Sequence, residues 1–281
     1  MFYEATIQDI NESIDLLWEM AQKPECCCYP IYYDGIKTKA DMMALLKGNF
    51  ENGNNTLFIY EENGIFQGMI GYFEIREERY IQLNFCIMQH GTRNAMQALM
   101  HHLNEKVKGD TIYFGFPEEN KEALEFMEDN CFEKIEESWN HSFFFSEYQE
   151  RKIGKTVRKL TRETYHEFMK LYKTDAYTYW NADRIFNTFD GWNIYIAYEH
   201  EQPVSAVILQ KGTEQEEIFG VSITESMTEE HYEAMMNTAL KESKERGVKY
   251  LTYFSQEQEK GCLERLGFHC IGKYVLYIKK M

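Results

Sequence analysis

Hydrophobic and polar positions alternate along Tyr80–Met88, and this alternation predicts a β-strand whose two faces differ. The apolar residues that share one predicted face are Ile81, Leu83, Phe85 and Ile87. Asn84 falls on the opposite, more polar face. A strand of this kind can carry functional side chains on one face while it packs with the other.

A tight loop and a helix are predicted directly after this strand. The loop Gln89–Ala95 contains Gly91, and apolar residues then recur at helical spacing as far as Leu103, before Gly109. A loop that opens a helix leaves backbone N–H groups unpaired at the positive end of the helix dipole. Such a place binds phosphate groups.

The next segments add a strand and a short helix. Thr111–Phe116 has the pattern of a strand, Pro117 ends it, and Asn120–Phe132 has the pattern of a short helix that closes in Cys-Phe. With the preceding elements, the predicted order is strand, loop, helix, strand and helix.

In this order of elements the chain resembles the GCN5-related N-acetyltransferase (GNAT) superfamily. That family has an (Arg/Gln)-x-x-Gly-x-(Gly/Ala) pyrophosphate loop that opens a helix, followed by a helix of the form Asn-x-x-Ala…Tyr-x-x-x-Gly-Phe. The residues that match these patterns are Gly91 and Ala95 in the loop, and Asn120, Ala123 and Phe132 in the later helix. The resemblance implies a mixed α/β fold (α+β) and the use of acetyl-CoA or CoA.

Three positions depart from the family pattern. Arg93 stands where the family has its central glycine, Met127 where it often has a general-acid tyrosine, and Cys131 where glycine precedes phenylalanine. The hypothesis is therefore that any catalysis proceeds without a tyrosine acid at the family position.

Two offsets indicate an internal duplication. Gly64 and Glu201 lie in the turns of two predicted hairpins (201 − 64 = 137), and Phe132 and Phe268 end two predicted helices (268 − 132 = 136). This agreement predicts two tandem GNAT-like acyl-CoA N-acyltransferase domains. Their expected boundaries are residues 1–147 and 156–281, with a linker at 148–155.

The two halves differ at the predicted phosphate loop. Gly91 aligns with Thr228, in the segment Glu225–His231, which has three carboxylates and no glycine. Without glycine the backbone cannot approach a pyrophosphate closely, and carboxylates repel it. We therefore expect the cofactor in the first half only, and a degenerate second half that serves architecture or shapes the acceptor site.

Composition narrows the classes of partner. The chain of 281 residues is 44% hydrophobic with a formal net charge of −16, which favours a cationic amine and disfavours nucleic acid or an anionic membrane. Its 7 cysteines lack paired spacing, and no signal-peptide pattern or long apolar run is visible, so a cytoplasmic location is expected.

Consecutive Cys26, Cys27 and Cys28 lack the gap that a zinc site needs. A monomer and a homodimer stay open.

The resemblance also assigns candidate site residues. The cofactor-binding candidates are Phe85, Ile87, His90, Gly91, Thr92, Arg93, Asn94, Ala95 and Asn120. Glu74 and Asn84 are candidates to hold the water that accepts a proton from the attacking amine. Candidates for the acceptor site are the aromatic residues of the two loops that follow each half's first helix, Tyr29, Tyr32, Tyr33, Tyr177, Tyr179 and Trp180.

The leading hypothesis is an N-acetyltransferase that acts on a small-molecule amine. A second is a non-catalytic acyl-CoA-binding or interaction protein that kept the fold. A third is an aminoacyl-tRNA-dependent ligase, which the acidic charge disfavours.

Overall fold

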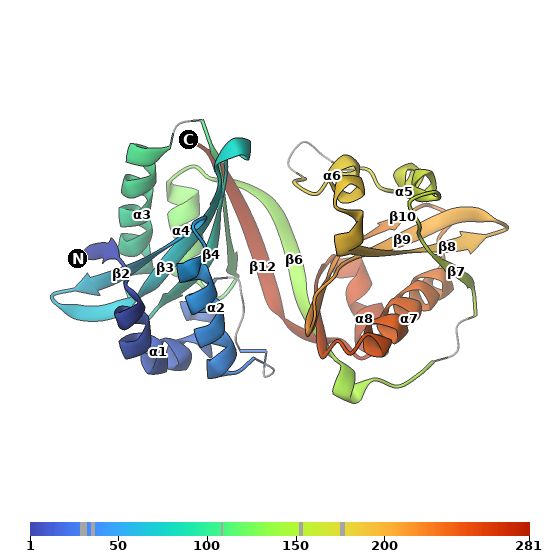
Figure 1. The fold of residues 1–281 in the computed structure, drawn as a ribbon, viewed down its shortest axis with the longest axis horizontal. Coiled ribbons are helices and arrows are strands. Elements are labelled where there is room, and N and C mark those ends of the chain that lie inside the picture. The colour runs from blue at the N-terminus through green and yellow to red at the C-terminus, as the bar shows by residue number, and fades with distance from the viewer. Residues whose placement is uncertain (29–32, 35–36, 108, 152–153, 175–177) are drawn as a thin grey trace. The chain divides into compact units, whose positions relative to one another are not determined.

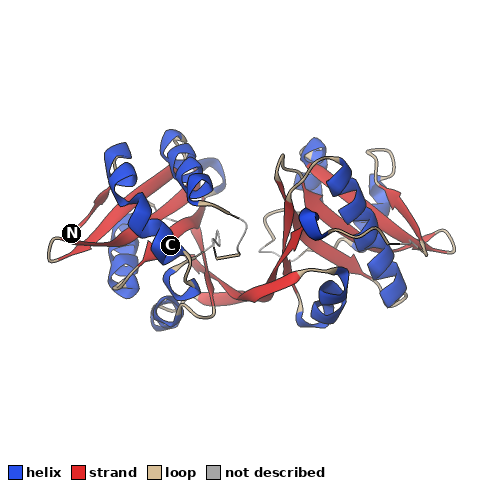
Figure 2. Ribbon diagram, turned by 90° about the horizontal axis from the view of Figure 1, so that it is seen from below, coloured by secondary structure: helices blue, strands red, loops and turns tan. Residues whose placement is uncertain are grey.

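The computed structural model describes residues 1–281 except 29–32, 35–36, 108, 152–153 and 175–177 (Figure 1). Two compact units divide the chain. The first unit is Met1–Glu137 with Gly272–Met281, and the second unit is Ser138–Ile271. In each unit helices lie on both faces of a sheet (Figure 2), which confirms the predicted mixed α/β class.

Helices and strands follow the same order along the chain in both units. The first unit contains β1 (Phe2–Glu4), α1 (Ile7–Ala21), α2 (Lys39–Glu51), β2 (Asn55–Glu62), β3 (Ile65–Ile75), β4 (Tyr80–Met88), α3 (Thr92–Lys106), β5 (Thr111–Pro117) and α4 (Lys121–Asp129). The second unit contains β7 (Thr156–Lys159), α5 (Tyr165–Leu171), α6 (Ala182–Asn187), β8 (Trp192–Glu199), β9 (Gln202–Gln210), β10 (Gln215–Ile223), α7 (Glu229–Glu245), β11 (Tyr250–Ser255) and α8 (Lys260–Leu266). The strands β6 (Glu133–Phe144) and β12 (His269–Lys280) each run from one unit into the other. None of the helices in the described part of the chain is both long and apolar enough to cross a membrane.

The sheet of the first unit has the strand order β1-β2-β3-β4-β5-β12. All neighbours are antiparallel except β4 and β5, which pair in parallel only from Tyr80 and Thr111 to Gln82 and Tyr113. Beyond Gln82 the two strands part. A β-bulge at Asn84 follows, because Gly71 pairs with Phe85 while Tyr72 pairs with Leu83.

The bulge changes the face on which the β4 side chains lie. Ile81 and Leu83 pack into the core with α3 and α4, whereas Phe85 and Ile87 pack into the core on the side of α1 and α2. The prediction of a strand is confirmed, but the prediction that these four residues share one face is wrong. The reason is physical: one extra residue in a strand shifts every later side chain to the other face.

The sheet of the second unit repeats this plan in the order β6-β11-β10-β9-β8-β7. Its parallel pair is β10 with β11, which pair from Gln215 to Ile218 and then part. A bulge at Phe219 follows the parting, as the one at Asn84 does in the first unit.

Two matching turns support the predicted duplication. The hairpin turn Asn63-Gly64 has positive φ at both residues (52° and 76°), and so has the turn at His200 and Glu201 (47° and 61°). Only turns of this left-handed type match the twist of the flanking strands, which is why Asn-Gly marks them in sequence.

Most of the last strand, β12, belongs to the first unit, whereas the sequence predicted it in the second. β12 pairs with β5 through Tyr274–Lys280, whereas β6, which follows α4, pairs with β11 through Trp139–Phe144. The compact units therefore divide at 137/138 and 271/272, and they differ from the predicted ranges 1–147 and 156–281. Alternation of residue types marks a strand but does not specify a partner that is distant in sequence.

The C-terminal end of α4 carries local strain that its counterpart lacks. Cys131 has φ of 56° where Gly267 of the second unit has φ of 98°, and both precede the same bond, from Phe132 N to Met127 O (3.0 Å) and from Phe268 N to Leu263 O (2.9 Å). A side chain in this left-handed conformation costs about 1–2 kcal/mol. Glycine avoids that cost at the end of a helix.

Replacing Cys131 with glycine should therefore stabilise the protein. Relief of the left-handed strain is partly offset by the greater freedom of glycine in the unfolded chain, so we expect a gain of about 0.5–1 kcal/mol in the free energy of unfolding. The matched control, Gly267→Ala, should destabilise by about 1 kcal/mol. Urea unfolding curves of the three proteins test this, and equal midpoints for wild type and Cys131→Gly would contradict the strain argument.

Candidate active site

The candidate site is the place where β4 leaves β5, and the word groove denotes this parting of the two strands. One edge of β4 is paired with β3 throughout, so the groove is bounded by the other edge. The resemblance places the pantetheine arm of the cofactor against this edge. In the structure the chain's own residues lie there: Cys27 forms an antiparallel bridge with Ile87, and Cys28 N donates to Cys86 O at 2.9 Å.

Asn120 fixes this segment from the opposite side of the groove. Its side-chain nitrogen donates to Cys27 O at 3.0 Å, and its side-chain oxygen accepts from Ala123 N at 3.2 Å. The side chain is only 1% exposed. Asn120 is thus both the cap of α4 and the anchor of the Cys27–Cys28 segment, and both its polar atoms already have protein partners.

The cysteine side chains of this segment are buried and neutral. Neither Cys27 nor Cys28 forms a disulfide, and burial raises the pKa of each thiol well above its usual range. A buried neutral thiol behaves as a small hydrophobe, so these residues contribute packing to the groove rather than nucleophiles.

The predicted phosphate loop has the expected backbone and an unexpected occupant. Gly91 caps α3 with φ of 71°. The next two amides, Thr92 N and Arg93 N, each donate at 3.2 Å to one carboxylate oxygen of Glu122, which lies in the first turn of α4. The end of this helix therefore binds an anion, and the anion here is part of the protein.

A second carboxylate borders the same loop. Glu62 accepts hydrogen bonds from Tyr60 OH at 2.6 Å and from Asn94 Nδ2 at 2.9 Å, and these bonds lower its pKa, Tyr60 contributing most. A Cβ added to Gly91 would meet Glu62 Oε1 at 3.0 Å. The loop therefore favours glycine for its backbone conformation, while an added side chain would press on Glu62.

Arg93 does not offset these two carboxylates. Its guanidinium pairs with Asp129 at 2.7 Å, so its charge is directed to the far end of α4. Sequence reasoning missed both Glu62 and Glu122. No motif or spacing could have indicated them, because they reach the loop only through pairing and packing of distant elements.

The two predicted catalytic residues lie on opposite faces of the sheet. Asn84 Nδ2 donates to Asn55 Oδ1 on the face covered by α1 and α2. Tyr72 packs with α3 on the other face, and Glu74 lies on that same face because it comes two residues later in the strand. Glu74 also pairs with Arg76 at 3.3 Å. The structure therefore does not bring Glu74 and Asn84 together around one water. The side-chain oxygen of Asn84 is buried and has no partner among the described residues.

The predicted acceptor residues are divided between the units. Tyr29, Tyr32 and Tyr177 lie outside the described residues. Tyr33 packs against the core beside α1 in the first unit, and burial, followed by the nearby Cys27, raises its pKa. In the second unit Tyr179 lies 4.0 Å beneath the guanidinium of Arg184, and Trp180 contacts Trp192 at 5.0 Å between ring centres.

The second unit satisfies the corresponding helix end locally. Thr228 and His231 form a capping box at the start of α7, and His231 Nε2 lies 2.8 Å from Glu199 Oε2. Glu199 also pairs with Lys155 at 3.1 Å. The free edge of β10 beyond Ile218 has no bridge from another segment within the described residues.

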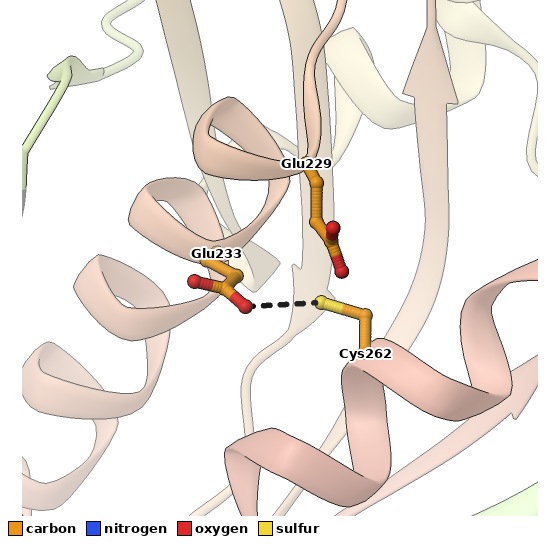
Figure 3. Close-up of side chains that lie close together, drawn as sticks. All are labelled: Glu229, Glu233 and Cys262. Carbon is orange, nitrogen blue, oxygen red and sulfur yellow. Dashed lines mark hydrogen bonds between the residues drawn. The ribbon is translucent and has the colours of Figure 1, made fainter.

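One cluster on α7 and α8 has a composition that can hold a metal ion. Glu229, Glu233 and Cys262 place their ligand atoms within 4.8 Å of one another (Figure 3). Arg265 contacts Glu229 directly and lies 3.6 Å from Glu233, so a cation already faces both carboxylates. Burial, with Glu233 next, raises the pKa of Cys262 to about 12. The cluster is an ion-pair network around a neutral thiol.

Comparison with solved structures identifies the fold. A GCN5-related N-acetyltransferase from Sphaerobacter thermophilus aligns over 100% of this chain and 95% of its own, with a TM-score of 0.66 and 13% identity. The chain thus has the fold of the GCN5-related N-acetyltransferases.

Two further solved structures align over nearly the whole chain, and one of them is a tandem protein. A tandem GNAT protein from the clavulanic acid biosynthesis pathway aligns over 100% of this chain and 98% of its own (TM-score 0.54, 10% identity). A glucosamine N-acetyltransferase region of a fungal multi-domain enzyme aligns over 99% of this chain and 38% of its own (TM-score 0.60, 10% identity). No protein-family model and no curated protein sequence matches the chain.

Replacing Glu122 with glutamine should weaken the start of α3. The substitution removes a charge from the positive end of the helix dipole, so we expect a loss of about 0.3–1 kcal/mol in the free energy of unfolding. Glu125→Gln is the matched control, since Glu125 is an exposed residue of the same helix. Urea unfolding at low salt measures both, and a loss as large in the control would contradict a stabilising role for the contact of Glu122 with α3.

Proposed function

We propose that this protein is an N-acetyltransferase that transfers an acetyl group from acetyl-CoA to a primary amine of a small molecule. The observation that carries the proposal is the parting of β4 and β5 directly before a bulge at Asn84. The fold supports the general class, and the groove of the first unit supports the choice of donor.

The residues of the groove fit acetyl-CoA as the donor. The amides of Thr92 and Arg93 already hold a carboxylate, which shows that this helix end accepts negatively charged oxygen atoms. Gly91 allows the left-handed backbone conformation that turns these amides outward at the start of α3. The β4 edge at Cys86 and Ile87 accepts an extended partner, as its pairing with Cys27 and Cys28 shows. Acetyl-CoA would supply the thioester that carries the acetyl group.

Asn84 is the side chain best placed to orient the amine. Its oxygen is buried without a partner among the described residues, and its nitrogen is held by Asn55. An amide oxygen accepts an N–H bond but takes up no proton. Because Glu74 lies on the other face, the amine would arrive neutral or pass its proton to water.

No acid from the family's tyrosine position takes part in this scheme. Met127 occupies that position, and its side chain is fully buried in the core of the first unit. The departing thiolate would therefore be protonated by water. The net charge of −16 favours the approach of a cationic amine before it loses its proton.

A second candidate function is a non-catalytic acyl-CoA-binding or interaction protein. Two carboxylates at the phosphate loop, Glu62 and Glu122, favour it, because they oppose a pyrophosphate unless Glu122 moves away. Thiol release from acetyl-CoA over a panel of amines separates the two functions. CoA binding without thiol release for any amine would support the second.

The cofactor should bind in the first unit only. Gly91→Asp should abolish CoA binding, since it adds a charge and forces a side chain into the left-handed conformation beside Glu62. Thr228→Asp should change the affinity by less than about twofold, because aspartate is as good a helix cap as threonine. Calorimetric titration with CoA measures both, and equal losses would contradict the assignment to the first unit.

The rate of acetyl transfer should climb with pH. As the acceptor amine loses its proton, kcat/KM should rise by about tenfold for each pH unit below the amine's pKa and then level off. No decline from a tyrosine acid near its ordinary pKa of ~10 is expected. Initial rates of thiol release across the pH range provide the profile. A bell-shaped curve that keeps its upper limb with different amines would show an enzyme acid that this scheme lacks.

A further inference from the structure

Two residues at the start of α4 hold the protein groups that lie at the β4 edge and at the start of α3. Asn120, the cap of this helix, holds the carbonyl of Cys27, and Glu122, two residues later, holds the amides of Thr92 and Arg93. One short stretch of backbone thus connects the contact at the β4 edge with the contact at the start of α3.

The contacts at the β4 edge resemble those of an added strand. Cys27 bridges Ile87 in antiparallel sense, and Cys28 N donates to Cys86 O at 2.9 Å. Any extended ligand that paired with Cys86 and Ile87 along this edge would need the same backbone groups. The Cys27–Cys28 segment and such a ligand therefore exclude each other.

The same exclusion holds at the start of α3. Thr92 N and Arg93 N each carry one hydrogen, and each donates it to the Glu122 carboxylate at 3.2 Å. A phosphate oxygen could take these donors only after the Glu122 carboxylate had left. The charge of Glu122 would also repel a phosphate that came near.

We propose that the Cys27–Cys28 segment and Glu122 form an internal gate, which the first turn of α4 holds closed and which acetyl-CoA must displace to bind. This inference rests on the proposed function. On opening, a ligand amide would replace Cys28 N at Cys86 O, and phosphate oxygens would replace Glu122 on the two amides. No covalent bond changes.

With a gate of this kind, the apparent affinity equals the affinity of the open molecules multiplied by the fraction of molecules that are open. Weakening the closed state should therefore tighten binding. Asn120→Ser keeps a helix cap, since serine accepts from the same amide, but serine is too short to reach Cys27 O. Glu122→Gln removes the competing charge. We expect each variant to bind acetyl-CoA about five- to tenfold more tightly than wild type, the range that the loss of one hydrogen bond allows.

The experiment uses the full chain and two independent readouts. Calorimetric titration with acetyl-CoA gives the affinities of wild type, Asn120→Ser and Glu122→Gln. Asn130→Ser is the matched control, because Asn130 donates to Phe126 O at the other end of the same helix. Alkylation followed by peptide mass spectrometry gives the exposure of Cys27 and Cys28, which are 0% and 1% exposed in the closed state.

The gate predicts tighter binding by both variants, unchanged binding by Asn130→Ser, and faster alkylation of Cys27 and Cys28 in Asn120→Ser. Weaker binding by Asn120→Ser with unchanged alkylation would overturn it and make Asn120 a cofactor contact. Equal affinity in all four proteins would also overturn it while leaving the proposed function in place. A third outcome is faster alkylation of Cys27 and Cys28 in Asn120→Ser while none of the four proteins binds acetyl-CoA. That outcome would refute acetyl-CoA as the donor in the proposed function, and with it the displacement of the gate by acetyl-CoA.

Discussion

The structure of the first unit depends on how backbone groups find partners where β4 parts from β5. A strand that leaves its neighbour exposes N–H and C=O groups, and inside a protein such groups must be paired. At the edge of β4 the partner is the Cys27–Cys28 segment, which pairs at Cys86 and Ile87. The edge of β4 beyond this parting is thus covered by the chain itself, and the thiols of the segment join the apolar packing.

The helix that follows β4 obeys the same constraint. The first amides of α3 need acceptors, and Gly91 has no side chain to offer one, so Glu122 supplies both oxygens from α4. In the second unit Thr228 and His231 form a capping box at the start of α7. The first unit therefore holds the start of its helix with a carboxylate from α4, whereas the second unit caps its helix with Thr228 and His231 of the same segment. This difference, rather than the number of nearby carboxylates, distinguishes the two halves.

Much of the fold could be predicted because its signals are local. Alternation along β4, the Asn63-Gly64 turn and the Cys-Phe ending of α4 each depend on a few neighbouring residues, and the offset of 137 or 136 residues then revealed the repeat. Asn84 was singled out from the alternation along β4, but the bulge that sets its face leaves no mark in that alternation. The contacts of Glu122 with α3, of Asn120 with Cys27 and of β12 with β5 join residues at least 29 apart in sequence. Their side chains carry no pattern that names a partner.

Amide hydrogen exchange in the ligand-free protein tests the central claim, that the groove of the first unit is closed by the chain's own residues. The amide of Cys28 should exchange slowly, because it is bonded to Cys86 O, and its protection should fall in Asn120→Ser but not in Asn130→Ser. Fast exchange at Cys28 in the wild-type protein, as fast as in an unstructured peptide, would show that the edge of β4 is open and that the account is wrong.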